Sequence, residues 1–265
     1  ANSHYLLCTF TFFLLIFNKM LKVVQMIISE KYKFIFLKPY KVAGSSVEFA
    51  LSSILSNIDV ATYLSKDEEK ARQKLFGLCE QNNRKKLSDL IQNFSKQNKR
   101  DLQKFKWPKK FHPHCSADDV KSYLGDAKFN DYKKISIVRN PWDYLLSFYH
   151  WNPGKERRAP FEQWVFDNRH LIGQNNYQYK INGNCIVDIF LKFENLSEDL
   201  SKLPLNSDEL SKIKNCFSTT FLKSGYRQKG REIEIDYLKS AKFIDKAIES
   251  FCDIELNMFG YQRPY

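Results

Sequence analysis

The stretch KPYKVAGSSVE, residues 38–48, decides how the chain is organised. It separates the short apolar run FIFL, residues 34–37, from residues 47–55, in which apolar side chains recur at helical spacing. The first run stops before a proline and predicts a buried strand, and the second predicts a helix with Ser45 and Ser46 as candidate caps. A lysine, a glycine and two serines therefore occupy a predicted strand-to-helix turn.

Such a turn is suited to binding an anion, because it offers unpaired backbone N–H groups and the positive end of the helix dipole. Gly44 lets a ligand approach the backbone, Ser45 and Ser46 can donate hydroxyl hydrogen bonds, and Lys41 adds a positive charge. In the nucleotide P-loop the lysine follows the last glycine, whereas Lys41 precedes Gly44 by three residues. This order, with no paired acidic strand end for magnesium, disfavours a kinase or ATPase.

A second strand, turn and helix follow in SIVRNPWDYLLSFYHW, residues 136–151. Arg139 ends the predicted strand, and Ser147 lies eight residues later, about two turns into the predicted helix. An arginine fork and a serine hydroxyl can converge on a second phosphate, so the two turns together imply a ligand with two anionic groups. The aromatic side chains of this segment, among them Trp142 and Trp151, are interpreted as core packing.

The two turns resemble those of the sulfotransferases that use 3′-phosphoadenosine 5′-phosphosulfate (PAPS). In that family a P-K-T-A-G-T-S-like loop holds the 5′-phosphosulfate, and an arginine and a serine at this spacing hold the 3′-phosphate. The proline and the first threonine of the pattern are replaced here, while serines keep the hydroxyl groups. The resemblance implies PAPS as donor and PAP as product, with cofactor contacts from Lys41, Val42, Ala43, Gly44, Ser45, Ser46, Arg139 and Ser147.

Further segments resemble a bacterial-type branch related to the uronyl and heparan O-sulfotransferases. They are residues 59–72, 81–83, HPHCSADDV (112–120), FENLSEDL (193–200), KSGYRQK (223–229) and DIELNMFGY (253–261). The resemblance covers residues 32–261. It implies that a basic loop containing Lys223 and Arg227 closes over the 3′-phosphate, and that the acceptor is a carbohydrate or another molecule with a hydroxyl or amine.

The resemblance also suggests a mechanism. Lys41 would stabilise the leaving oxygen, and the amides of residues 44–46 would hold the phosphate, without a metal ion. His114 is the predicted general base, with His112 in reserve. Glu48 is interpreted as a carboxylate on the helix surface near the positive end of the dipole, and the alternatives are that it orients Lys41 or replaces the base. Glu194 could orient the Arg139 turn or cap the next helix.

Composition limits the alternatives. The chain has 265 residues, of which 43% are hydrophobic, so it can build a sizeable core. A formal net charge of +12 points to an anionic partner, and nucleic acid is one candidate. RNP-like aromatic patterns, helix-turn-helix signatures and zinc spacings are missing, so a nucleic-acid-binding module is the weaker alternative and no nucleic acid is expected as partner. The six cysteines form no C-x-x-C pair, so most are expected to be buried, reduced thiols, with one disulfide as the alternative.

The predicted fold is a single α/β, P-loop-like domain with a central, mostly parallel sheet flanked by helices. It covers residues 29–265 and closes with a helix over residues 233–259. Residues 1–28 form an apolar leader, in which residues 5–17 carry no charge. Three interpretations stay open: part of a signal-anchor, a signal-peptide core, or an extension before a start at Met20 or Met26. A cytoplasmic location is expected, with a membrane-anchored, Golgi-like one as the alternative.

Overall fold

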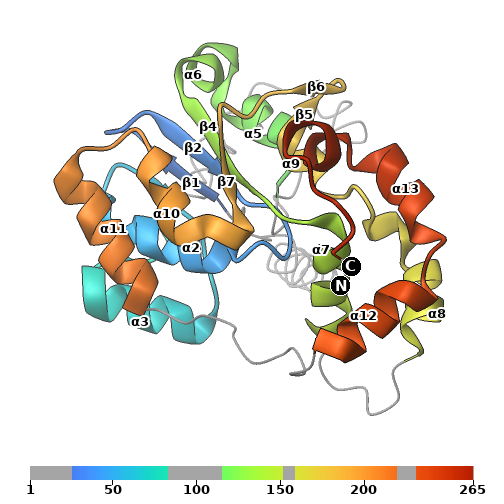
Figure 1. The fold of residues 1–265 in the computed structure, drawn as a ribbon. Helices are drawn as coiled ribbons and strands as arrows, with labels where there is room; N and C mark the ends of the chain where they lie inside the picture. Colours follow the sequence, from blue (N-terminus) through green and yellow to red (C-terminus); the bar gives the residue numbers. More distant parts are fainter. Residues whose placement is uncertain (1–25, 83–114, 152–158, 220–230, 265) are drawn as a thin grey trace, which may run out of the picture.

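The computed structural model describes residues 26–82, 115–151, 159–219 and 231–264. Within these ranges a five-stranded sheet with the order β3-β1-β2-β4-β7 forms the centre of the molecule (Figure 1). Its strands are β1 (Met26–Ser29), β2 (Phe34–Leu37), β3 (Val60–Ala61), β4 (Lys133–Val138) and β7 (Ile189–Lys192). Separate from it, β5 (Lys180–Ile181) and β6 (Asn184–Cys185) pair as an antiparallel hairpin.

The predicted mixed α/β class and mostly parallel sheet are confirmed. Strand β4 pairs in parallel with β2 on one side and with β7 on the other. Strand β1 pairs antiparallel with both β2 and β3, so it alone in this sheet runs against the others. The carboxyl ends of β2, β3, β4 and β7 therefore share one edge, at which loops can combine into a site.

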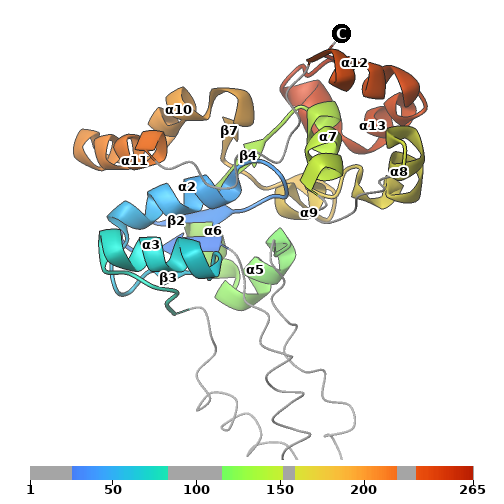
Figure 2. The ribbon, with the colours of Figure 1, turned by 90° about the horizontal axis from the view of Figure 1, so that it is seen from below.

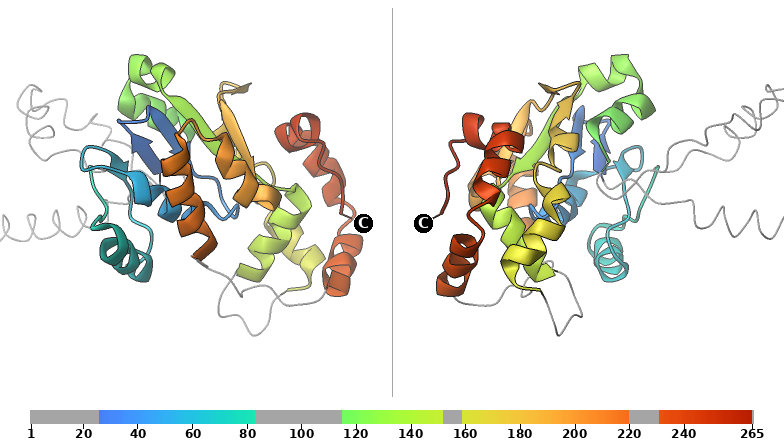
Figure 3. Two further views of the ribbon diagram at one scale, coloured as in Figure 1. Left: turned by 60° about the vertical axis from the view of Figure 1, so that its left-hand side comes forward. Right: turned by 90° about the vertical axis from the view of Figure 1, so that its right-hand side faces the viewer.

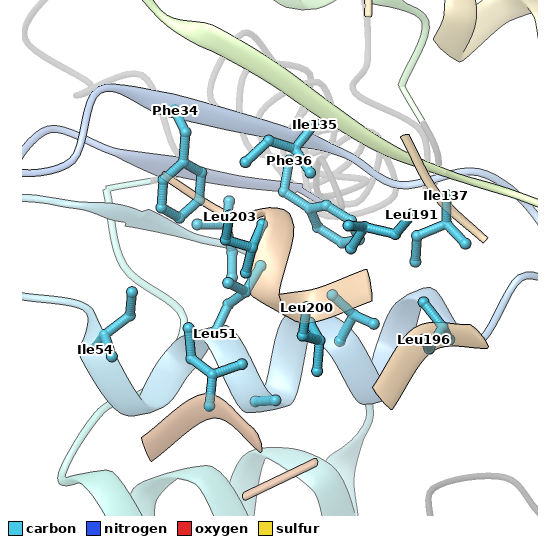
Figure 4. Packing of buried hydrophobic residues seen from close by; sticks show 14 of the residues in the cluster. Phe34, Phe36, Leu51, Ile54, Ile135, Ile137, Leu191, Leu196, Leu200 and Leu203 are labelled. Atoms are coloured by element: carbon cyan, nitrogen blue, oxygen red, sulfur yellow. The ribbon is translucent and has the colours of Figure 1, made fainter. Parts of the chain in front are cut away.

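The sheet packs against other elements on both faces, because apolar side chains of its central strands point to each face. Phe34 and Phe36 point to one face, where they pack with Leu51 of the first helix (Figure 4). Ile35 and Leu37 point to the other face, as the two-residue period of a strand requires. A parallel strand covered on both faces reads as a continuous apolar run, which explains FIFL.

Helices cover both faces (Figure 2). The face with Phe34 packs against α2 (Gly44–Leu51), α10 (Leu196–Asp199) and α11 (Ser207–Thr219). The other face packs against α5 (Ala117–Leu124) and α6 (Asp126–Asp131). Helix α3 (Lys66–Phe76) lies beside α2, since the rings of Phe49 and Phe76 are 5.4 Å apart.

A third apolar cluster lies beyond the end of β4 (Figure 3). It is built by α7 (Pro141–Trp151), α8 (Phe161–Asp167), α12 (Arg231–Ser240) and α13 (Ile244–Phe251). The short α9 (Asn176–Tyr179) leads into β5. Tyr149 is central to this cluster, because its ring meets those of Phe161, Trp164 and Tyr237 edge-on at 5.2–5.5 Å. The cluster fixes α7 relative to the sheet.

Two boundaries differ from the sequence prediction. The expected closing helix over residues 233–259 is three elements, namely α12, α13 and a π-helix over Ile254–Met258. At the first break the hydroxyl of Ser240 donates to the carbonyl of Tyr237 (2.7 Å), a local bond that competes with helix continuation. At the other end of the chain, residues 26–28 belong to β1, although the leader was expected to include them.

The described cysteines Cys79, Cys115, Cys185, Cys216 and Cys252 are all free thiols. Of these, only Cys115 and Cys252 are buried, so the expectation that most cysteines are buried was wrong. In the four described ranges, none of the helices combines the length and the apolar character needed to cross a bilayer. The uncharged residues 5–17 lie outside those ranges.

The C-terminal π-helix contains a buried carboxyl group that makes stability depend on pH. Glu255 is 5% exposed, and burial raises its pKa from 4.5 to about 7. A raised pKa means that the folded state binds the proton more tightly than the unfolded state does. The stabilisation is complete below about pH 4.5 and is lost as the pH rises through 7.

We expect the wild type to lose about 3 kcal/mol of unfolding free energy between pH 4.5 and 7.5 relative to Glu255→Gln. Urea denaturation at several pH values measures this difference. Glu249→Gln, an exposed change on α13, is the matched control and should keep the wild-type pH dependence. Parallel pH profiles for the wild type and Glu255→Gln would contradict the assignment.

Candidate functional site

The predicted anion loop connects β2 to α2 through an unusual backbone. Lys41 and Ala43 have φ angles of 54° and 59°, in the left-handed region that residues with a Cβ seldom adopt. Ala43 takes the N-cap position of α2, and no side chain caps the helix. Ser45 and Ser46 lie inside the first turn, so their prediction as caps was wrong. The first turn also lacks acidic residues, which leaves its positive end uncompensated by a carboxylate of its own.

Gly44 is required by the packing of this protein itself. A Cβ at this position would lie 2.7 Å from Cγ of Lys38, closer than real Cβ contacts. The stem of Lys38 therefore runs directly beneath the start of α2. Sequence reasoning assigned this glycine to the approach of a ligand, whereas the structure gives it a neighbour from the same chain.

A buried polar chain continues from that lysine. The ammonium of Lys38 donates to Oε2 of Glu48 at 2.8 Å, and both side chains are at most 2% exposed. Thr62 donates to the other oxygen of Glu48 at 2.7 Å, and its carbonyl accepts from Arg72 of α3 at 2.9 Å. Glu48 is thus buried and bonded to Lys38 and Thr62, so its interpretation as a surface carboxylate was wrong. These bonds tie the ends of β2 and β3 to α2 and α3.

Arg139 connects the two predicted turns. Its Nε donates to Oδ2 of Asp143 at 2.7 Å, and its Nη2 forms an ion pair with the same oxygen at 2.6 Å. Its Nη1 donates to the carbonyl oxygen of Lys41. The guanidinium carbon lies 3.8 Å from the ring centroid of Phe193. Arg139 is 6% exposed. A buried guanidinium needs such partners, and here they come from the helix after β4 and from the loop after β2.

The turn before α7 is fixed from both sides. The side-chain oxygen of Asn140 accepts from the amides of Trp142 (3.1 Å) and Asp143 (3.3 Å), which caps the helix. Glu194 accepts from the backbone N–H of Asn140 at 2.9 Å. Of the two roles considered for Glu194, the structure therefore gives it the bracing of the Arg139 turn.

Lys41 extends toward α7. Its ammonium lies 4.8 Å from the ring centroid of Trp151 and 5.9 Å from that of Phe148, which are cation–π distances. Trp151 is 44% exposed, so its assignment to the core was wrong, whereas Trp142 is buried as expected. Ser147 is half-buried on the same helix, one turn before Trp151. The structure thus brings the Lys41 loop and the Arg139 turn to one edge of the sheet, and Ser147 lies on the helix that follows this turn.

The side chain of Asn175 also supports the loop, and neither its role nor that of Lys38 was predicted from the sequence. Asn175 is 5% exposed, accepts from the backbone N–H of Tyr40 at 2.8 Å and donates to its carbonyl at 3.3 Å. Burial raises the pKa of the Tyr40 phenol, so that group stays neutral beside Lys41. No local sequence pattern marks Asn175, which is 135 residues away from Tyr40 in the chain. The sequence did give a signal for Lys38, because it places a charged residue directly after a fully apolar strand.

The other predicted residues lie outside the described ranges. His112 and His114, the candidate bases, fall within residues 83–114, and Lys223 and Arg227 fall within residues 220–230. Models of protein families, curated proteins and solved structures were compared with the chain, and none matches it.

The Lys38–Glu48 pair gives a test of the loop's support. We expect Lys38→Met to lower the unfolding free energy by about 3 kcal/mol, because it leaves a buried carboxylate without its cation. Lys38→Met combined with Glu48→Gln should lose less than the single change, since no charge is then left unpaired. Guanidinium denaturation measures both.

Lys33→Met is the matched control. It removes a lysine at the opposite end of β2, whose ion pair with Asp131 is more than half exposed on both sides. An exposed pair contributes little to stability. Equal losses for Lys38→Met and Lys33→Met would show that the buried pair has no special role.

Proposed function

We propose that the chain transfers a sulfuryl group from PAPS to a hydroxyl or amine of an acceptor, with a carbohydrate as the favoured acceptor class. One observation carries this proposal: the Lys41 loop and the Arg139 turn meet at one sheet edge, joined by the hydrogen bond from Arg139 to the Lys41 carbonyl. A donor with phosphates at two positions needs two anion sites held at a fixed separation. The same proposal makes the α/β domain P-loop-like.

The proposed reaction uses the charges of this edge. The bond between sulfur and the bridging oxygen of the phosphosulfate breaks, and a bond forms from sulfur to the acceptor oxygen or nitrogen. Negative charge develops on the leaving phosphate oxygen, where the ammonium of Lys41 and the uncapped start of α2 would stabilise it. The acceptor proton passes to a general base, for which His114 remains the proposal.

The 3′-phosphate is proposed to bind near Ser147. Arg139 already bonds Asp143 and the Lys41 carbonyl, so its charge would act on the phosphate from within a braced turn. Ser147 is half-buried on α7, about one turn after Asp143 and on the same face of the helix. A hydroxyl donor beside a fixed positive charge is suited to a phosphate oxygen.

Calorimetry with PAP tests the two anion sites. We expect Ser147→Ala to weaken PAP binding about tenfold, because a hydrogen bond to a charged phosphate is lost. Lys41→Ala should chiefly slow transfer from labelled PAPS to a panel of glycans and small alcohols, by about 100-fold or more. Lys33→Ala removes the same charge at the other end of β2 and should change neither quantity. PAP affinity unaffected by both site variants would contradict the proposal.

Asp143→Asn separates two roles of Arg139. If the arginine acts on the phosphate, loss of the competing carboxylate charge should keep or tighten PAP binding. If Arg139 only braces the turn, both Asp143→Asn and Arg139→Ala should weaken PAP binding. Transfer should persist in EDTA, whereas phosphoryl transfer by a kinase would stop with it.

A further inference from the structure

Lys41 is held at both ends by the segment that contains α7. Its backbone carbonyl accepts from Arg139, which precedes the helix, and its ammonium lies 4.8 Å from the ring centroid of Trp151, which ends the helix. A lysine side chain has many rotamers and is not fixed by its backbone alone. The indole is therefore a contact that orients the charged end.

Trp151 differs from the other aromatic residues of α7. Trp142, Tyr144 and Tyr149 are 5–6% exposed and belong to the third apolar cluster, whereas Trp151 is 44% exposed. Its ring meets Phe148 edge-on at 6.4 Å, and Phe148 in turn meets Tyr40 at 6.1 Å. An exposed indole contributes less to core stability than a buried one. The position of Trp151 is therefore explained better by its contact with the Lys41 ammonium than by core packing.

The spacing along α7 connects this indole to the proposed site. Asp143, Ser147 and Trp151 follow at intervals of four residues, which puts them on one face of the helix. Asp143 bonds Arg139 at the start of this face, and Lys41 lies over Trp151 at its end. The Lys41 ammonium thus lies along the same helix face as the serine proposed to bind phosphate.

We propose that Trp151 is a positioning residue that holds the Lys41 ammonium by a cation–π contact, in the orientation from which it reaches the leaving oxygen. This inference rests on the proposed function of Lys41. Trp151 would influence the reaction through the side chain of Lys41, without itself touching the donor. Pre-organisation of a charged group lowers the barrier only if it acts on the transition state, so the effect belongs to turnover more than to affinity.

The contact itself is testable without turnover. Tryptophan emission of the ligand-free protein is compared for wild type, Lys41→Met, Trp151→Phe and the double variant. We expect Lys41→Met to change the emission in the wild-type background and to leave it unchanged in the Trp151→Phe background. An equal change in both backgrounds, or none in the first, would overturn the proposed contact.

The positioning role is tested with labelled PAPS and PAP calorimetry. We expect Trp151→Leu to lower kcat about tenfold while PAP affinity stays within about twofold, and Trp151→Phe to restore most of the rate because it keeps an aromatic face. Phe166→Leu, an exposed aromatic change on α8, is the control and should keep wild-type kcat. Wild-type kcat in Trp151→Leu would overturn the positioning role alone. No transfer by the wild type would overturn the proposed function, and the positioning role with it.

Discussion

The hydrogen bond between the Arg139 guanidinium and the carbonyl of Lys41 is the contact on which the candidate site depends. It exists because β2 and β4 pair in parallel, so that the turns after both strands emerge at the same edge of the sheet. The guanidinium is buried, and a buried charge is stable only with partners. Asp143 supplies the opposite charge, and the Lys41 carbonyl supplies an acceptor from a distant part of the chain. Two loops 98 residues apart are thereby joined.

Several contacts beneath this edge of the sheet hold the loop after β2 in one conformation. The Lys38–Glu48 pair and Thr62 lie below the loop, and Asn175 holds the backbone of Tyr40. These contacts offset the strain of two left-handed residues that are not glycine, which is the arrangement expected where a loop must keep one conformation for binding. The loop itself carries the cationic side chain of Lys41, whose ammonium lies over the ring of Trp151. A fixed backbone with an ammonium held in one orientation suits a site where charge develops during a reaction.

Much of the fold could be predicted locally. FIFL is an apolar run that ends before Pro39, and ISIV, residues 135–138, is a run rich in β-branched residues that ends before Arg139; both belong to strands. Helix α7 begins at Pro141, as its fixed φ favours. Two other features were not predicted. Strand β1 lies at the end of the apolar leader, and the closing helix divides at Ser240, whose hydroxyl donates to the carbonyl of Tyr237. Serines expected to cap α2 lie within it, because the helix begins earlier, with its N-cap at Ala43, two residues before Ser45.

The sequence by itself determined the α/β class, the two strand-to-helix turns and the concentration of Lys41, Gly44, Arg139 and Ser147 in them, because strand and helix periodicity and turn chemistry are local properties. Only the tertiary structure decided which side chains meet. Glu48 bonds Lys38, Gly44 makes room for that lysine, and Trp151 lies under Lys41 instead of in the core. Such contacts join residues far apart in the chain, and their geometry follows from the strand order and from the packing of α7, which no local pattern encodes.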